Sequence, residues 1–366
     1  MSYEKPDIYR DLQVHLDQFP IGFPATSTGI ELKVLKHLFT ESEAQIAIML
    51  TWKYSTKEEI YKNLDQSDML IDELEKCLDI MVRKGILNFK DENQTKLYAN
   101  APLVVGVFEY QVNKLTKEFL EDFSEYLITA FGAELLGTKI SQFRTIPIEQ
   151  SVKPQNVIAT YDELRNVIEN VEEPIGVANC VCRQGKDLVG KPCNKTSLRE
   201  TCLYFGKKGK LFISQGWARQ INKDEAQALL NKAESDGLVL QAGNTKNPEF
   251  ICSCCGDCCE ILTRLNLLPR PSRVVSANFY ASIDPELCSG CGTCITRCQV
   301  KAIKEVNGIS RVIEKRCIGC GLCVPTCPEE AIILKKKDQE MSPPDSTDEL
   351  YAMIMEKKQQ LRSKKK

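Results

Sequence analysis

The sequence predicts an α+β protein of several domains, and three observations support this. Its 366 residues are enough for two or three domains. Apolar residues recur at helical spacing in the first hundred positions, whereas all but one of the 18 cysteines lie between Cys180 and Cys327. Within that region one cysteine pattern occurs twice, 29 residues apart. These shifts divide the chain into five expected segments: 1–100, 101–175, 176–270, 280–335 and 336–366.

The charge and composition are those of an ordinary globular protein. Hydrophobic residues make up 43% of the chain, and 48 Lys and Arg face 50 Asp and Glu, for a net charge of −2. A chain so nearly neutral has no overall attraction to nucleic acid or anionic lipid. No apolar signal-peptide core follows Met1 and no run of about 18 apolar residues occurs, so we expect a cytoplasmic protein without a membrane span. Cysteines kept in a reducing compartment usually hold metal rather than disulfides.

Segment 1–100 has the pattern of a winged-helix-like domain. Apolar spacing predicts three short helices and a longer one that ends at Gly85. Ser55 and Glu58 form the expected capping box of the third helix. Two short apolar runs then flank a polar stretch, as strands flank a wing. The expected helices are 29–39, 43–50, 55–64 and 68–84, and the strands 86–89 and 96–98 enclose a wing at 91–95.

Winged helices often bind DNA, but the charges of this segment argue against that role. Residues 26–100 hold 10 Lys and Arg against 13 Asp and Glu. The helix over 68–84, which would enter the major groove, carries five carboxylates and three basic side chains. Because the phosphate backbone requires a basic face, we expect protein docking here and regard DNA binding as unlikely. A redox-responsive transcription regulator is kept as an alternative.

Outside this segment, helical periodicity predicts a connecting region and a basic C-terminal helix. The expected elements are helices near 114–131 within the connection 101–175, an amphipathic helix over 223–235, and a terminal helix over 348–361 after a proline-containing linker.

Segment 280–335 contains two identical cysteine runs, each reading C-x2-C-x2-C-x3-C. The runs are Cys288, Cys291, Cys294 and Cys298, then Cys317, Cys320, Cys323 and Cys327. Three thiolates two residues apart can wrap one cubane, and the fourth, one helical turn later, reaches a neighbouring cluster. Thiolate ligands alone favour iron–sulfur clusters or zinc, so a pair of zinc sites is the alternative.

This segment resembles the bacterial ferredoxin domain that carries two [4Fe-4S] clusters. The resemblance implies one cluster on Cys288, Cys291, Cys294 and Cys327 and a second on Cys317, Cys320, Cys323 and Cys298. Glycines between the cysteines would let backbone amides approach the sulfides. The sequence departs from the family at one position, since Gln299 follows Cys298 where the second run has Pro328.

Segment 176–270 is a cysteine-rich middle domain with a further metal site. Its cysteines are Cys180, Cys182, Cys193, Cys202, Cys252, Cys254, Cys255, Cys258 and Cys259. Consecutive side chains of an extended segment face opposite ways, so adjacent cysteines cannot all bind one metal. Three interpretations of these cysteines remain open. They hold a third [4Fe-4S] cluster, with or without a fourth, or they hold structural zinc on four thiolates. In the third interpretation, Cys258 and Cys259 form a redox-active dithiol. Basic residues nearby would place positive charge near such a site, or form a solvated basic face, which is the commoner arrangement; they are Lys186, Lys191, Lys195, Arg183 and Arg199.

The Cys254-Cys255-Gly256 step is similar to the CCG motifs of heterodisulfide reductases. The whole order of segments resembles a large family of 4Fe-4S binding proteins of anaerobic bacteria and archaea, which implies a redox role. We therefore expect an iron–sulfur protein that relays single electrons to or from a partner oxidoreductase, rather than an autonomous enzyme. An oxidoreductase subunit with a catalytic cluster in the middle domain is the second alternative. The sequence contains no G-x-G-x-x-G nucleotide fingerprint.

Overall fold

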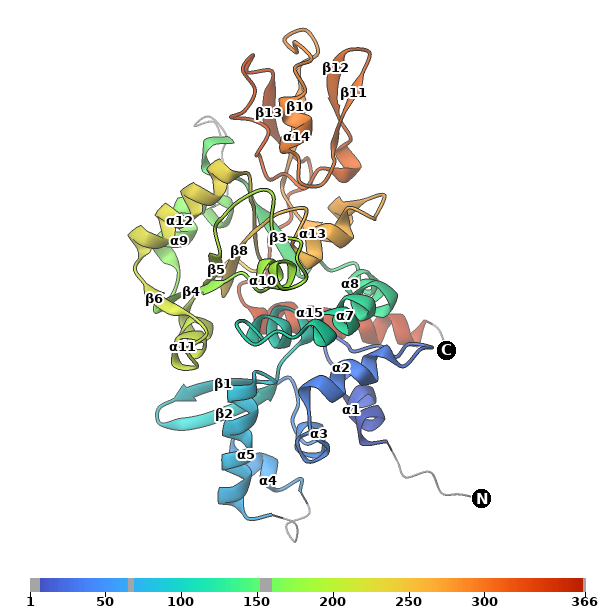
Figure 1. The fold of residues 1–366 in the computed structure, drawn as a ribbon, viewed down its shortest axis with the longest axis vertical. Coiled ribbons are helices and arrows are strands. Elements are labelled where there is room, and N and C mark those ends of the chain that lie inside the picture. The colour runs from blue at the N-terminus through green and yellow to red at the C-terminus, as the bar shows by residue number, and fades with distance from the viewer. Residues whose placement is uncertain (1–6, 65–68, 152–159, 365–366) are drawn as a thin grey trace. The chain divides into compact units, whose positions relative to one another are not determined.

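The computed structural model describes residues 7–64, 69–151 and 160–364, and it divides into two compact units (Figure 1). The first unit comprises Met1–Thr138 together with Ile354–Lys366, and the second is Lys139–Met353. Each unit is described by itself below. Within the described residues, every helix is too short or too polar to cross a membrane.

The first unit begins with five helices and an antiparallel hairpin. These elements are α1 (Ile8–Leu16), α2 (Ile30–Leu38), α3 (Glu41–Ile48), α4 (Lys57–Tyr61), α5 (Ile71–Lys84), β1 (Leu87–Glu92) and β2 (Thr95–Asn100). As expected, Gly85 ends α5 in the left-handed conformation, with φ +78°. The expected start of this helix at Asp68 lies outside the described residues.

Two local expectations in this region were wrong. The capping box of α4 is formed by Thr56 and Glu59, one position after the expected pair, because Thr56 is the residue with extended backbone before the helix. The expected wing over 91–95 is largely strand. β1 and β2 pair as far as Glu92 and Thr95, which leaves Asn93 and Gln94, both at positive φ, as a two-residue turn.

The remainder of the first unit is helical and aromatic. It includes α6 (Phe108–Tyr110), α7 (Lys117–Tyr126), α8 (Gly132–Gly137) and the end of α15 (Thr347–Ser363). Phe108 stacks on Phe123 of α7, with ring centroids 4.2 Å apart and both side chains buried. Lys358 of α15 donates to Glu134 and, at 2.9 Å, to the carbonyl of Phe19. The terminal helix expected over 348–361 is thus confirmed, and its final residues pack within this unit.

The second unit is built around a seven-stranded sheet in the order β6-β4-β5-β8-β7-β3-β9. Neighbouring strands are antiparallel except for β3 and β9. The strands are β3 (Phe143–Ile146), β4 (Ile175–Asn179), β5 (Glu200–Tyr204), β6 (Arg219–Ile221), β7 (Val239–Gly243), β8 (Phe250–Cys254) and β9 (Val275–Ser276).

One face of this sheet forms the hydrophobic core. Val177, Leu203, Leu240 and Ile251 of the central strands pack with apolar residues of α9 (Leu164–Asn170) and α12 (Lys223–Asp236). α12 matches the amphipathic helix expected over 223–235, and Gly237 ends it at φ +81°. The remaining helices of the middle segment are α10 (Val181–Leu188), α11 (Gly206–Ser214) and α13 (Glu260–Leu265).

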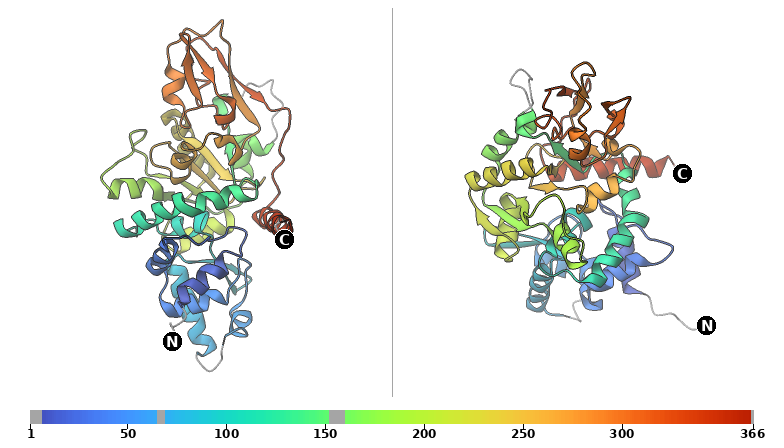
Figure 2. Two further views of the ribbon diagram at one scale, coloured as in Figure 1. Left: turned by 90° about the vertical axis from the view of Figure 1, so that its right-hand side faces the viewer. Right: turned by 45° about the horizontal axis from the view of Figure 1, so that its top comes forward.

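The cysteine repeat forms two small hairpin-like layers at one end of the second unit (Figures 1 and 2). β10 (Phe279–Ile283) pairs with β13 (Ile332–Lys336), and β11 (Ile303–Val306) pairs with β12 (Ile309–Val312). A single turn of helix, α14 (Thr293–Arg297), connects the cysteines of the first run.

Candidate metal centres

The eight cysteines of the repeat surround two separate cavities. Cys288, Cys291 and Cys294 of the first run line one cavity together with Cys327 of the second run. Cys317, Cys320 and Cys323 line the other together with Cys298. The fourth cysteine of each run thus crosses to the other cavity. Apolar side chains, including Ile283 and Leu322, complete the two linings.

Backbone amides of this segment point at cysteine sulfurs. The N–H groups of Ala281, Ala302 and Ser310 donate to the Sγ atoms of Cys317, Cys298 and Cys288, at 3.4, 3.2 and 3.4 Å. Such bonds favour a thiolate and tune the potential of a cluster bound to it. Burial raises the pKa of Cys320 to about 12, so binding of a cation at this cavity must displace its proton.

Six of the nine middle-domain cysteines lie together; strand register places three of them, and the starts of two helices place the other three. Cys202 of β5 pairs directly with Cys252 of β8, and Cys254 follows two residues later on the same face. Cys180 caps α10 directly after β4, with Cys182 in its first turn, and Cys259 caps α13. We refer to these residues as the six-thiol ring: Cys180, Cys182, Cys202, Cys252, Cys254 and Cys259.

The thiols of the six-thiol ring hydrogen-bond to one another in a closed sequence. Hydrogen bonds from Cys182 and Cys202 hold the pKa of Cys180 well below its ordinary range. Those from Cys182 and Cys254 do the same for the pKa of Cys259. Cys252 completes the circle by contacting both Cys202 and Cys254. The two thiols with a lowered pKa, Cys180 and Cys259, both neighbour Cys182 in the ring, and a lowered pKa favours the thiolate form that binds metal.

The other three cysteines lie on the core side of the sheet with one carboxylate. The ligand atoms of Cys193, Cys255, Asp257 and Cys258 are all within 4.8 Å of one another. The Sγ atom of Cys193 is 3.6 Å from that of Cys255 and 3.8 Å from Oδ1 of Asp257. Cys255 and Cys258 are each 1% exposed and belong to the hydrophobic core. We refer to these four residues as the Cys3Asp group.

Strand alternation separates the two groups. Cys252 and Cys254 face the six-thiol ring, whereas Ile251 faces the core and Cys255 follows on that side. This division agrees with the expectation that adjacent cysteines serve different sites. Sequence reasoning missed Asp257, although its place between Cys255 and Cys258 is the signal that could have identified it.

A buried arginine lies between the two groups. Arg183 is 0% exposed, and its guanidinium donates to Oγ1 of Thr201 at 2.7 Å, to the carbonyl of Ser253 at 2.9 Å and to Sγ of Cys255 at 3.5 Å. Burial opposes its charge, but thiolates at Cys180 and Cys255 raise the pKa of Arg183 above its ordinary value. Its Nε has no partner among the described residues. A buried cation with an unsatisfied donor beside thiols fits an anionic metal–thiolate centre.

The two cysteine-rich segments meet at Gln299. Its side-chain Oε1 accepts the backbone N–H of Gly256 at 2.8 Å, and its carbonyl accepts Nδ2 of Asn266 at 3.1 Å. Gln299 follows Cys298, and Gly256 follows Cys255. The residue that departs from the ferredoxin pattern thus supplies an acceptor that proline lacks.

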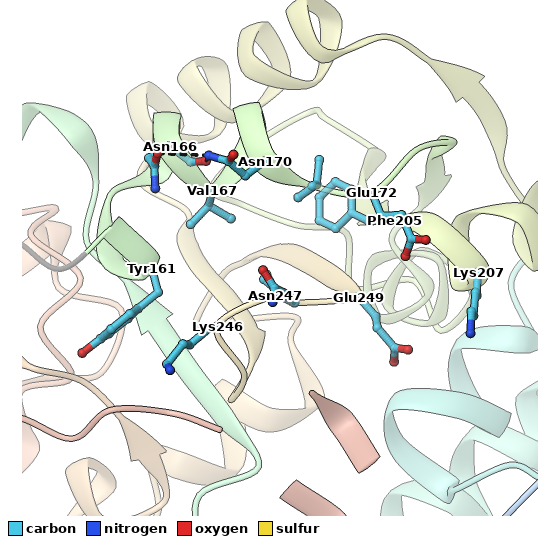
Figure 3. A pocket seen from close by; sticks show the side chains of 12 residues that line it. Tyr161, Asn166, Val167, Asn170, Glu172, Phe205, Lys207, Lys246, Asn247 and Glu249 are labelled. Atoms are coloured by element: carbon cyan, nitrogen blue, oxygen red, sulfur yellow. Dashed lines mark hydrogen bonds between the residues drawn. The ribbon is translucent and has the colours of Figure 1, made fainter. Parts of the chain in front are cut away.

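A further pocket of the second unit lies elsewhere (Figure 3). The pocket lies at one end of the paired strands β5 and β8, where Tyr204 is opposite Phe250. Its lining includes Phe205, which directly follows β5, and Glu249, which directly precedes β8. Lys246 and Tyr161 lie on another side of it. None of the twelve lining residues is a cysteine, so the pocket is separate from both thiol groups.

Comparison with known proteins agrees with the geometry of the repeat. No curated protein and no solved structure matches the chain. One family model matches, and its description is a 4Fe-4S dicluster domain. The match covers residues 281–334, which contain all eight cysteines of the two cavities. Residues 281–334 are therefore a ferredoxin-like 4Fe-4S dicluster domain, as the repeat predicted.

Proposed function

We propose that this protein relays single electrons between a partner oxidoreductase and iron–sulfur clusters held by its own cysteines. The observation that carries this proposal is the crossed lining of the two cavities, each with three cysteines of one run and one of the other. A [4Fe-4S] cluster bound there would accept and release one electron. Four thiolates for each cluster leave no iron open to a substrate, which favours relay over catalysis in this domain.

The exposure of the cysteines suggests a direction through the domain. Cys291, in the cavity completed by Cys327, is exposed, and the neighbouring Leu287 is 54% exposed. In the other cavity, Cys317 and Cys323 are buried. The first cavity is therefore the side that a redox partner would approach, with Leu287 as part of an apolar contact.

The second cavity is connected to the middle domain through the residue that follows one of its cysteines. Cys298 lines it, and the next residue, Gln299, is hydrogen-bonded to Gly256 beside the middle-domain cysteines. We propose that the six-thiol ring holds a third iron–sulfur cluster at the inner end of this path. The ring fits a group of several metal ions better than a single ion, because its thiols are spread around a circle. No three of its sulfurs lie within 4.8 Å of one another, since among the described residues only the Cys3Asp group brings three or more ligand atoms that close together.

For the first unit we propose a winged-helix-like fold with a protein-docking role. The carboxylates of α5 are partly engaged inside the unit, since Glu75 pairs with Lys57 and Lys96, and Asp79 also pairs with Lys96. The exposed side chains of α5 include Asp72 and Glu73, which would repel a phosphate backbone. The unit therefore supports a protein partner better than DNA.

The test is anaerobic isolation of the full chain, with iron and sulfide analysis and electron paramagnetic resonance during stepwise reduction. We expect signals of reduced clusters, and faster reduction of a one-electron acceptor by the wild-type chain than by C291A or C320A. C77A is the matched control, because Cys77 lies in α5, outside both cysteine-rich segments. A chain without iron, or dicluster variants that transfer electrons at the wild-type rate, would overturn the proposal.

A further inference from the structure

We propose that the Cys3Asp group binds one divalent metal ion of the zinc class, separate from any iron–sulfur cluster. The proposal goes beyond electron relay, because such an ion has no redox chemistry of its own and acts on the structure. It assigns Asp257 as a ligand together with Cys193, Cys255 and Cys258.

The spacing of the ligand atoms fits a single ion. Zinc binds sulfur at about 2.3 Å in tetrahedral sites, which places neighbouring sulfurs about 3.8 Å apart. The Sγ atoms of Cys193 and Cys255 are 3.6 Å apart, and Oδ1 of Asp257 is 3.8 Å from Sγ of Cys193. A four-iron cluster is much wider than an ion. Among the described residues, the dicluster cysteines form no such compact group; each set of four instead lines a cavity together with apolar side chains.

The ligand types also favour zinc. A borderline-soft ion accepts thiolates and a carboxylate together, whereas iron–sulfur clusters favour thiolates alone. Oδ2 of Asp257 accepts the backbone N–H of Asn194 at 2.9 Å, which orients the carboxylate and leaves Oδ1 toward the sulfurs. This is the outer hydrogen bond expected of a carboxylate ligand to a metal.

The surroundings explain why the group requires a cation. Three thiolates and a carboxylate carry more negative charge than one divalent ion neutralises, and Arg183 beside Cys255 offsets part of the excess. Cys255 and Cys258 are buried among apolar core residues, where unpaired negative charges are strongly unfavourable. An ion would thus stabilise the ligand arrangement that the fold already provides.

Its structural role would be to join two distant loops. Cys193 and Asn194 lie between α10 and β5, whereas Cys255, Asp257 and Cys258 lie between β8 and α13. Gly256, inside the second loop, donates to Gln299 of the dicluster domain. The ion would therefore hold in place the segment against which the dicluster domain packs.

The experiment measures zinc, iron and sulfide in the full chain purified without oxygen, together with zinc-edge X-ray absorption. We expect about one zinc per chain, with three sulfurs at about 2.3 Å and one oxygen at about 2.0 Å. C193A should lose at least ten-fold in zinc content with iron and sulfide unchanged. The matched control C180A, in the six-thiol ring, should lose iron and retain zinc.

D257N is a second variant of the same site, for the case that C193A does not fold. Its amide has the shape of the carboxylate and retains an oxygen acceptor for the N–H of Asn194. We expect D257N to fold and to bind zinc at least ten-fold more weakly in a chelator competition. Absence of zinc from the wild-type chain overturns the proposal, as does a loss of iron in C193A equal to that in C180A. Because dicluster signals are read separately in the same samples, failure here is distinct from failure of the electron-relay proposal.

Discussion

The backbone N–H of Gly256 donates a 2.8 Å hydrogen bond to Oε1 of Gln299, and this bond joins the two cysteine-rich segments of the chain. Each partner directly follows a cysteine, Cys255 in the middle domain and Cys298 in the dicluster domain. Gln299 is only 6% exposed. The contact is therefore a partly buried connection between residues that flank two different metal-site candidates.

Substitution of Gly256 by alanine should weaken this connection. A Cβ at position 256 would overlap the backbone carbonyl oxygen of Gln299, so one of the two segments must shift. We expect G256A to lower the free energy of unfolding by about 1–3 kcal/mol, measured by anaerobic urea denaturation. G137A is the control, since a Cβ there meets nothing within 4 Å. Equal stability of the two variants would show that the segments do not meet in this way.

The crossed cavities predict which cysteine variants affect the same cluster. C298A and C320A should abolish one paramagnetic signal of the reduced protein, because both residues line one cavity. C327A and C291A should abolish the other signal for the same reason. If C298A matches C291A instead, each run binds its own cluster and the crossed assignment is wrong.

Two glycines on either side of Cys291 provide a matched pair. Both have φ +73°, but a Cβ at Gly290 would overlap the carbonyl oxygen of Gly308, whereas a Cβ at Gly292 meets nothing within 4 Å. G292A should therefore show only the backbone strain of about 1–2 kcal/mol. G290A should also displace the loop and reduce the iron content, measured per folded chain. Similar iron contents would contradict this account of the loop.

Arg183 should be required for the stability of the middle domain. R183M removes a buried cation from Thr201, Ser253 and Cys255, and we expect it to lower the free energy of unfolding by about 3–5 kcal/mol. R183K keeps the positive charge but lacks the planar guanidinium group, and it should lower the free energy of unfolding by less than R183M does. The control R199M removes a partly exposed pair with Asp187 and should change stability by about 1 kcal/mol or less. Denaturation midpoints of the three variants provide the comparison.

Glu234 predicts a pH dependence of stability. Burial raises the pKa of Glu234 to about 6, from an ordinary value of 4.5. The folded state thus favours the protonated carboxyl, and the group's contribution to stability is greatest below about pH 4.5 and declines as the pH rises through about 6. E234Q keeps an oxygen for the N–H of Glu149 and should be more stable than wild type by about 2 kcal/mol at pH 7.

The difference between E234Q and wild type should shrink toward pH 5, which separates this effect from general acid lability. D224N, an exposed position on the same helix, serves as the control and should show no such trend. A constant difference between E234Q and wild type across this range would rule out titration of Glu234.

Local patterns in the sequence determined much of the architecture. The dicluster domain follows from cysteine spacing, because the ligands of each run are a few residues apart and the loop geometry is local. The ends of α5 and α12 follow from Gly85 and Gly237 for the same reason. Where neighbouring residues compete for one local role, the sequence was less decisive, as the shift of the α4 capping box to Thr56 shows.

Only the tertiary structure decided how the middle-domain residues are grouped. Cys193 and Cys255 are 62 positions apart in sequence, and strand pairing brings them together while it directs Cys254 to the opposite side of the sheet. The recruitment of Asp257, the burial of Arg183 and the bond from Gly256 to Gln299 likewise depend on segments that meet only in the folded chain. Spacing along the chain determines which ligands can wrap one cluster, whereas the register of distant strands determines which ligands share a site.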